Sequence, residues 1–491
     1  MPSYPTLAAI DLGSNSFHLQ VGRVEGEQLF YLDAIKESVR LAGGLTAAKY
    51  LDAASQQRAL TCLARFGERL RGMPEGSVRA VGTSALRVAK NAPEFLEKAR
   101  TALGFDIEIV AGREEARLIY LGVSHSLPLH PEPRLVVDIG GGSTECIIGT
   151  GYEPQDRESL RMGCVVFSNR FFGNGIIDKA SLKAAEIAAR IETRIVAGPV
   201  FGKGAWVEAV GSSGTARALG DICRQNGHSD GAITLEGLRW LRDRMIKFGL
   251  VQQLAVPGLK SDRQPVIAGG LAIMLAIFEE LGIESMTVAQ GAMREGILWD
   301  LLGRVHDRDM RDVTVSQFQR RYQVDMPQAR RVEALSVQLL GNLQADQQSL
   351  HRLAWAARMH EIGISIAHSG FHKHGAYILE NADMPGFSRR DQSALAQLVR
   401  ASRGGLEKAV PRGDTADWLL ILCLRLALLF NMSRNDGNLP ELALRVDAGV
   451  YRLGVPATWL KDNPLTCTAL EDEVRDWGKV ATGLRLYLET T

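Results

Sequence analysis

One short segment occurs twice in the first third of the chain, and this repeat constrains the fold more than any other feature of the sequence. Residues 10–16 (IDLGSNS) recur as residues 137–143 (VDIGGGS). Each copy lies between two apolar runs, a pattern typical of a strand, a tight turn and a second strand. Two unrelated hairpins with Asp-Gly turns are the alternative, but the shared Asp-x-Gly-x-x-Ser core favours a duplicated architecture.

Both turns have the composition of a phosphate-binding loop. Glycine permits positive φ and lets backbone N–H groups approach a ligand closely. Successive N–H groups form an anion-binding concavity, to which Ser and Thr hydroxyls add donors. The phosphate-binding candidates in the two turns are Ser14, Asn15, Ser16, Gly140, Gly141, Gly142, Ser143 and Thr144. Asp11 and Asp138 end the first strand of each copy, which suits them to bind Mg²⁺ beside phosphate oxygens.

The first 300 or so residues alternate between strands and helices. We expect strands at residues 78–81, 107–110 and 206–210, and helices at 92–103, 113–123, 179–197, 215–223 and 271–281. This order predicts a duplicated α/β architecture with a cleft between two similar lobes, residues 1–120 and 121–303.

From residue 304 the pattern becomes helical. We expect helices at 328–343, 353–360, 391–401 and 416–433, short strands at 442–446 and 450–453, and one terminal helix. These elements predict a helical third domain, residues 304–440, and a small α+β domain, residues 441–491.

Composition excludes several classes of protein. The formal net charge is +1, which disfavours a protein that coats polyanions non-specifically. Six cysteines without a CxxC pair argue against a disulfide framework or a zinc site and fit a reducing compartment. The N-terminus has no basic leader before an apolar core, and the apolar run at 418–430 is too short to cross a bilayer. We expect a cytoplasmic protein, free or peripheral at the membrane, with no transmembrane segment.

Seven motifs occur in a characteristic order: AIDLGSNSFHL (9–19), VGTSALR (81–87), GREEARLIYLGV (112–123), VVDIGGGSTE (136–145), RMGC (161–164), VGSSGT (210–215) and GAMREG (291–296). With these motifs the chain resembles the exopolyphosphatase and guanosine pentaphosphate phosphohydrolase family, within the superfamily of actin, sugar kinases and heat-shock ATPases. The resemblance implies duplicated ribonuclease H-like lobes, an HD-like helical domain and a small C-terminal domain. It also implies hydrolysis of terminal phosphates from inorganic polyphosphate, from guanosine pentaphosphate, or from both.

The segment HSGFHKHGAYIL (368–379) looks more like the long exopolyphosphatases than the dedicated pentaphosphate hydrolases. The resemblance further implies Mg²⁺ or Mn²⁺ as cofactor, a monovalent cation such as K⁺, and a homodimer. The expected substrate is inorganic polyphosphate, with guanosine pentaphosphate as the alternative or as an additional substrate. The near-zero net charge and the few aromatic residues in the helical half predict no specific nucleic-acid partner.

The same resemblance assigns roles to individual residues. Glu115, the second Glu of the EEAR segment, is the general base that activates water. Arg87 is directed at phosphate, for which a guanidinium fork is well suited. The loop of Gly211, Ser212, Ser213, Gly214 and Thr215 precedes a helix, so its N–H groups are available to an anion. Asp138 and Glu145 flank the second turn and, with Asp11, are the candidate metal ligands.

Spacing alone leaves alternatives open for these residues. Acidic residues in the first turn of a helix also complement its dipole, and Ser or Thr before a helix often serves only as an N-cap. Glu145 could be the base and Glu115 the metal ligand. Arg117 is left outside the site, because it could pair with a carboxylate on its own helix.

The helical half carries a modest excess of positive charge. Residues 304–414 contain sixteen Lys or Arg and twelve Asp or Glu. This surface is either ordinary solvated helix or a track for the distal phosphates of a long chain.

His360 and Glu361 resemble the core of an HD-type metal phosphohydrolase, but Glu361 replaces the metal-binding Asp. We expect an HD-like domain without hydrolytic activity, since a binuclear centre needs a full set of ligands.

Two other classes of function share the phosphate turns. A nucleotide-switched module of the actin type would need a nucleoside pocket in the second lobe, where the sequence offers Ser-Ser-Gly-Thr. A sugar kinase would need a catalytic Asp and a sugar-binding segment, and neither is identifiable. An exopolyphosphatase is therefore the leading hypothesis.

Overall fold

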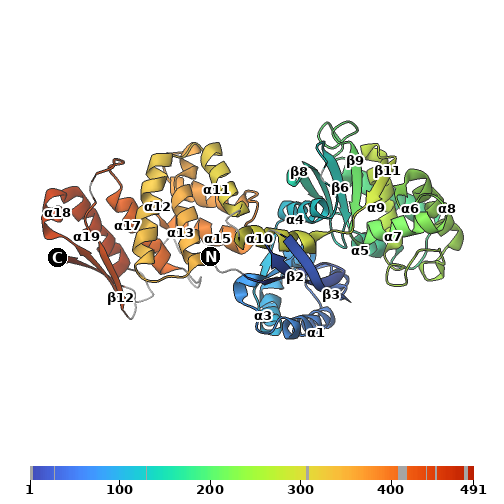
Figure 1. Ribbon diagram of the computed structural model, residues 1–491, viewed down its shortest axis with the longest axis horizontal. Helices are drawn as coiled ribbons and strands as arrows, with labels where there is room; N and C mark the ends of the chain where they lie inside the picture. Colours follow the sequence, from blue (N-terminus) through green and yellow to red (C-terminus); the bar gives the residue numbers. More distant parts are fainter. Residues whose placement is uncertain are drawn as a thin grey trace. The chain divides into compact units, whose positions relative to one another are not determined.

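A computed structural model describes residues 4–26, 28–128, 130–305, 309–406, 417–437, 439–447, 450–479 and 485–490. The chain divides into two compact units, Met1–Met310 and Arg311–Thr491. Figure 1 shows α/β lobes in the first unit and a helical bundle with a small sheet in the second. The division of the first unit into residues 1–120 and 121–303 stays a prediction.

The first unit contains two sheets that share one order of five strands, read from opposite ends below. The second sheet has one further strand, β10, at its edge. The first sheet runs β3-β2-β1-β4-β5, with β1 (Thr6–Leu12), β2 (Ser16–Glu25), β3 (Gln28–Ser38), β4 (Val78–Gly82) and β5 (Ile107–Ile109). The second runs β10-β11-β9-β6-β7-β8, with β6 (Arg134–Ile139), β7 (Thr144–Thr150), β8 (Glu153–Leu160), β9 (Glu208–Ser212), β10 (Ile233–Thr234) and β11 (Ser285–Val288). In each sheet an antiparallel meander of three strands continues into parallel strands. The repeat in the sequence is therefore a repeat in the fold, as expected.

Helices cover both sheets. They are α1 (Ala53–Arg69), α2 (Ser84–Val88), α3 (Ala92–Leu103), α4 (Gly112–His125), α5 (Cys164–Phe172), α6 (Lys179–Thr193), α7 (Ser213–Gln225), α8 (Leu235–Phe248), α9 (Ile267–Leu281) and α10 (Met293–Val305). α1 and α3 pack with one face of the first sheet. α5, α6, α8 and α9 pack with one face of the second sheet. The inner faces of both sheets share a third core with α4 and α10.

The helices α4 and α10 are exchanged between the two copies. α4 follows β5 of the first sheet but packs against β7 and β8 of the second, whereas α10 follows β11 of the second sheet and packs against β1 and β2 of the first (Figure 1). They also pack on each other, at a crossing made by two glycines. A Cβ on Gly296 would lie 1.8 Å from the Leu118 carbonyl oxygen, and one on Gly122 would lie 2.0 Å from the Ala292 carbonyl oxygen. The backbones of the two helices are thus in direct contact.

The second unit is a helical bundle followed by a small sheet. The helices are α11 (Met310–Arg321), α12 (Met326–Gly341), α13 (Gln347–Met359), α14 (Phe371–Asn381), α15 (Arg389–Ala401) and α17 (Trp418–Phe430). The C-terminal part contains α18 (Ala457–Asp462), α19 (Pro464–Gly478) and a sheet of β12 (Ala443–Asp447), β13 (Val450–Val455) and β14 (Arg485–Thr490). In the part of the chain that the structure describes, no helix has both the length and the apolar composition needed to span a bilayer.

Most expected elements are present with boundaries shifted by a few residues. The expected helix at 179–197 ends at Thr193, and the one at 215–223 begins at Ser213. Residue 416 of the expected helix at 416–433 lies outside the described residues. The expectation of one terminal helix was wrong, because two helices and the final strand β14 end the chain.

Candidate active site

The two glycine-containing turns lie face to face in the first unit. They connect β1 to β2 and β6 to β7, at the same position in each sheet. A Cβ on Gly141 would lie 3.0 Å from Ser14 Cβ and 3.2 Å from the Asn15 nitrogen. A Cβ on Gly142 would lie 2.8 Å from the hydroxyl oxygen of Ser84, at the start of α2. The turns that recur in the sequence are thus brought together across a cleft.

Close approach explains these glycines, and positive φ does not. None of Gly13, Gly140, Gly141 or Gly142 has positive φ, which corrects the first of the two reasons given for them. A Cβ on Gly13 would lie 2.8 Å from the Ser16 carbonyl oxygen. Gly163 of the RMGC motif is needed for the same reason, since its Cβ would lie 2.5 Å from the Gly141 backbone.

The segment that follows each three-stranded meander donates backbone hydrogen bonds to the carbonyl oxygens of the turn. Arg40 N–H donates to Asn15 O at 2.7 Å, and Ala42 N–H donates to Ser14 O at 2.9 Å. In the second copy, Cys164 and Val165 N–H groups donate to the carbonyls of Gly140 and Gly141 at 2.9 and 3.0 Å. With their carbonyl oxygens bound in this way, both turns are rigid, which suits them to present N–H donors to an anion.

The turns form the floor of a cleft of about 860 Å³. Twelve of the residues singled out from the sequence line it: Asp11, Ser14, Asn15, Ser16, Glu115, Asp138, Gly140, Gly141, Gly142, Ser143, Ser213 and Gly214. Six do not: Arg87, Thr144, Glu145, Gly211, Ser212 and Thr215.

Several expected phosphate-binding hydroxyls are engaged with the backbone. Thr144 Oγ1 donates to Met162 O at 2.7 Å, and Ser212 Oγ donates to Gly291 O at 3.1 Å. Ser213 Oγ and Thr215 Oγ1 both donate to Ile139 O at 3.0 Å. These bonds tie the start of α7 to the end of β6, so the Gly211 to Thr215 segment offers backbone N–H groups more readily than hydroxyls. Ser213 has a φ of 71°, a strained conformation for a non-glycine residue.

A cluster of buried carboxylates lies beside the turns. Burial, followed by the charge of Glu115, raises the pKa of Asp11 to about 8. Burial also raises the pKa of Asp138 to about 6, although the nearby Ser212 and Ser213 act to lower it. The pKa of Glu145 is raised by burial and then by Glu115 and Asp138, although Ser159 donates to its carboxylate at 2.7 Å. The negative charges of Glu115 and its neighbours therefore repel one another.

Glu115 is held by an arginine that the sequence had also singled out. Arg87 Nη1 donates to Glu115 Oε2 at 2.6 Å and to Val110 O at 3.0 Å. The Arg87 side chain is 20% exposed and that of Glu115 only 9%. In this structure Arg87 contacts Glu115 and does not line the cleft, and its role in phosphate binding stays a prediction. Glu145, the alternative base, lies outside the cleft lining and is 1% exposed.

Two features of the carboxylate cluster fit the binding of a divalent cation. Asp11 Oδ1 is buried and has no hydrogen-bond partner, and a cation would relieve the repulsion among the carboxylates. Among the described residues, no three His, Cys, Asp or Glu side chains form a ready-made metal site. This arrangement suits Mg²⁺, which is usually held by one or two carboxylates together with water and substrate phosphates.

The cleft also contains basic residues that sequence reasoning missed. They are Lys36, Arg217, Arg224, Lys260, Arg263 and Arg294. Four of them lie close enough to act on His18, whose pKa is lowered to about 3 by burial and then by Arg294, Lys36, Arg217 and Arg263. Arg294 Nη1 lies 3.4 Å from His18 Nδ1. These residues come from β3, α7, α10 and the loop before α9, so no local spacing connects them. Only Arg294 lies in one of the quoted motifs.

In the second unit, an arginine pairs with the HD-like residues. Arg434 donates to Glu361, and its Nη1 lies 3.0 Å from Asp325 Oδ2. Burial lowers the pKa of His360, whose Nδ1 lies 2.6 Å from Ala357 O. A guanidinium group therefore lies against the carboxylate that would ligate a metal in an active HD centre.

Fold and site together define a protein with two similar α/β sheets and a cleft lined by glycine-containing turns, carboxylates and basic side chains. A family model for the Ppx/GppA phosphatase family matches residues 21–305, and a model for domain III of that family matches residues 310–474. The chain belongs to the Ppx/GppA phosphatase family.

Solved structures agree with this assignment. The chain is 25% identical to an exopolyphosphatase-like protein, with a TM-score of 0.55, over 61% of this chain and 98% of that one. It is 26% identical to the PPX-GPPA enzyme of Aquifex aeolicus, with a TM-score of 0.50, over 60% of this chain and 98% of that one. An exopolyphosphatase from Cytophaga hutchinsonii shares the fold at 24% identity and a TM-score of 0.55, over 61% of this chain and 98% of its own.

Proposed function

We propose that the protein is an exopolyphosphatase, which releases terminal orthophosphate from inorganic polyphosphate. The observation that carries this proposal is the chemistry of the cleft beside the two turns. Six Lys or Arg and six Asp or Glu side chains line it, and no Phe, Tyr or Trp does so among the described residues. A purine is usually held by stacking or by an apolar pocket, whereas a linear polyanion needs repeated positive charge. The cleft therefore favours polyphosphate over a nucleotide.

In this mechanism the terminal phosphoryl group lies between the two turns. Backbone N–H groups of both turns bind its oxygens, and Glu115 removes a proton from the attacking water. A bond forms between the water oxygen and the terminal phosphorus while the bridging P–O bond breaks, and the shortened chain leaves as an anion. Arg87 holds Glu115 in position through its 2.6 Å hydrogen bond. The basic residues of the cleft neutralise the leaving chain.

Asp11 and Asp138 are the residues that would hold Mg²⁺ or Mn²⁺, with Glu145 behind them. When bound, the metal neutralises charge on the phosphate oxygens. The family's phosphatases are generally metal-dependent, so hydrolysis should stop in excess chelator and return when Mg²⁺ is restored. Full activity in chelator would contradict the metal role of these carboxylates.

The substrate test measures phosphate release from long-chain polyphosphate with no nucleotide present, and in parallel from guanosine pentaphosphate and ATP. We expect rapid release from polyphosphate. Release only from guanosine pentaphosphate would make the protein a pentaphosphate phosphohydrolase. Tight ATP binding without release from either of the other substrates would indicate a nucleotide-switched module.

The contact between Arg434 and Glu361 supports a second unit without a hydrolytic centre of its own.

A further inference from the structure

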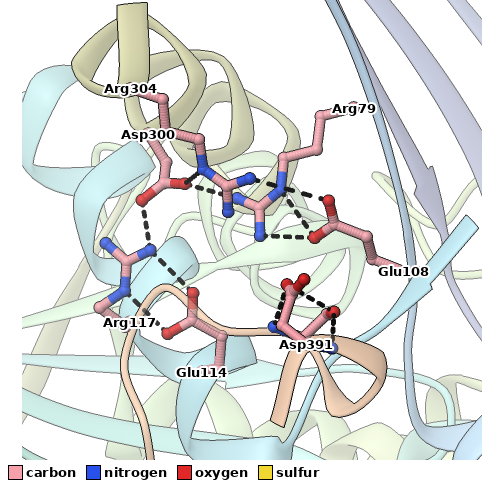
Figure 2. Close-up of polar contacts among 8 residues, drawn as sticks. Arg79, Glu108, Glu114, Arg117, Asp300, Arg304 and Asp391 are labelled. Atoms are coloured by element: carbon pink, nitrogen blue, oxygen red, sulfur yellow. Dashed lines mark hydrogen bonds and ion pairs between the residues drawn. The ribbon is translucent and has the colours of Figure 1, made fainter. Parts of the chain in front are cut away.

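Six charged side chains of the first unit form a network that is largely buried (Figure 2). They are Arg79 on β4, Glu108 on β5, Glu114 and Arg117 on α4, and Asp300 and Arg304 on α10. Three arginines balance three carboxylates. The network does not line the cleft, and the proposed mechanism uses none of its members.

Asp300 is the centre of this network. Its Oδ2 accepts from Arg79 Nη1 at 2.6 Å and from Arg304 Nε at 3.1 Å, and its Oδ1 accepts from Arg117 Nη2. The Asp300 side chain is 4% exposed, and that of Arg79 only 1%. Burial alone would raise the pKa of Asp300, but Arg117, Arg79 and Arg304 together hold it below its ordinary value. Asp300 is therefore an ionised carboxylate buried among three guanidinium groups.

Arg117 connects Asp300 to the first turn of α4. Its Nε and Nη2 donate to the two oxygens of Glu114, each at 2.8 Å, so the pair is bidentate. Glu114 immediately precedes Glu115, and both lie in the first turn of the helix. A bidentate guanidinium contact fixes orientation as well as distance. The position of Asp300 is thus transmitted to the backbone that carries Glu115.

The other members of the network connect to the remaining site residues. β4, which carries Arg79, leads into α2 and Arg87. β5, which carries Glu108, leads into α4, and Arg79 donates to Glu108 Oε2 at 3.1 Å. α10, which carries Asp300, begins at the cleft with Arg294. One buried carboxylate therefore joins the three segments that supply Arg87, Glu115 and Arg294.

We propose that Asp300 is a positioning residue for hydrolysis, which sets the location of Glu115 through Arg117 and Glu114. The proposal rests on the proposed function, in which Glu115 is the general base. Misplacement of a reacting group by about 1 Å is enough to lower a rate by about 100-fold. A network with a purely structural role would affect folding without changing the chemical step selectively.

The test compares four variants of the full-length protein with Mg²⁺ and long-chain polyphosphate: Asp300→Asn, Arg117→Lys, the double variant and Glu115→Gln. Arg117→Lys keeps the charge but loses the bidentate geometry. We expect Asp300→Asn to lower kcat about 10- to 100-fold and to change KM less than about threefold. If Asp300 acts through Arg117, the double variant should lose no more kcat than the worse single variant.

Glu208→Gln is the control for the loss of an ion pair elsewhere in the unit. Glu208 accepts from Arg134 Nε at 2.8 Å, and the two residues begin the adjacent strands β9 and β6, at the ends away from the turns. This variant loses an ion pair of the same unit and should lower the thermal midpoint without lowering kcat. If Asp300→Asn behaves like this control, or if its effect on kcat adds to that of Arg117→Lys, the positioning role is wrong.

The outcomes also separate this proposal from the proposed function. Substantial turnover in Glu115→Gln would reject Glu115 as the base. An inactive Glu115→Gln beside a fully active Asp300→Asn would reject only the positioning role. Should Asp300→Asn fail to fold, Arg117→Lys alone decides, because a selective loss of kcat supports the coupling to Glu115 and an unchanged kcat overturns it.

Discussion

The helices α4 and α10 occupy equivalent places in the two copies of the fold but bring opposite charges to the cleft. Each follows the strand that completes its parallel run, β5 in the first sheet and β11 in the second. Near its start α4 carries Glu115, and α10 carries Arg294, and both residues line the cleft. The duplicated turns keep the same Asp-x-Gly-x-x-Ser core, whereas these helices have diverged. In the proposed mechanism, the duplicated turns bind phosphate, and the diverged helices supply the general base and one of the cations.

The largest effect is expected when Glu115, the acidic residue that α4 brings to the cleft, is replaced. Glu115→Gln keeps the shape of the side chain and its contact with Arg87, but the amide does not accept a proton from water. We expect kcat to fall by about 10²–10⁴ with polyphosphate binding retained, measured by phosphate release and by equilibrium binding. Retention of more than about a tenth of wild-type turnover would transfer the role to another carboxylate, Glu145 first.

A smaller effect is expected where the two helices touch. In Gly296→Ala the new methyl group meets the Leu118 carbonyl oxygen, and backbone atoms yield less readily than side chains. We expect the free energy of unfolding to fall by about 3 kcal/mol. The measurement is the midpoint of unfolding in urea, which should be lower. Gly341→Ala is the control, since Gly341 ends helix α12 and a Cβ there meets nothing within 4 Å. Equal midpoints for the two variants would show that the helices tolerate separation.

On the basic side we expect an effect on affinity. Arg294→Gln removes one cation from the cleft, and a charge-assisted hydrogen bond contributes about 1.5–3 kcal/mol. KM for polyphosphate should therefore rise by roughly 10- to 100-fold, and its dependence on salt should weaken. Arg239→Gln on α8, whose Nη2 lies 3.2 Å from Glu279 outside the cleft, is the control. An unchanged KM in Arg294→Gln would exclude Arg294 from substrate binding.

The smallest expected effect comes from removal of the second unit. A chain that ends after Met310 keeps both helices and Arg304, which donates to Asp300. We expect short chains to be hydrolysed with little change, while long chains bind more weakly because basic contacts are lost. The measurement is KM and its salt slope for both lengths. An equal rise in KM for long and short chains would refute a track for distal phosphates in residues 304–414. Two arginines of this region, Arg358 and Arg400, already pair with Asp312 and Glu380.

Sequence reasoning succeeded where the relevant residues are contiguous. The turns, the strand pairs around them and the helix that carries Glu115 all lie within short motifs, so local spacing was sufficient. One of its two reasons for the glycines, positive φ, was wrong. The close approach of the second turn to Ser14 and Ser84 was not foreseen, because it depends on residues far away in the chain.

The basic side of the cleft was missed because it is assembled from scattered elements. Lys36, Arg217 and Arg263 have no common spacing, and nothing in their local sequence distinguishes them from surface residues. Arg117 was assigned to an ordinary pair on its own helix. Its pairing with Glu114 is real, but both residues are buried and the second partner is Asp300, which lies 183 positions further along the chain. Long-range contacts of this kind have no signature in a single sequence.

The exchange of α4 and α10 has a consequence for the order in which the protein is made. α10 is the last element of the first unit to be synthesised, yet it covers the inner face of the first sheet, including Leu7 and Ala9 near the N-terminus. Until residues 293–305 have left the ribosome, those apolar side chains lack their native cover. The first copy therefore obtains its complete apolar cover only after the second copy has been synthesised, and contacts of such high sequence separation favour slow folding.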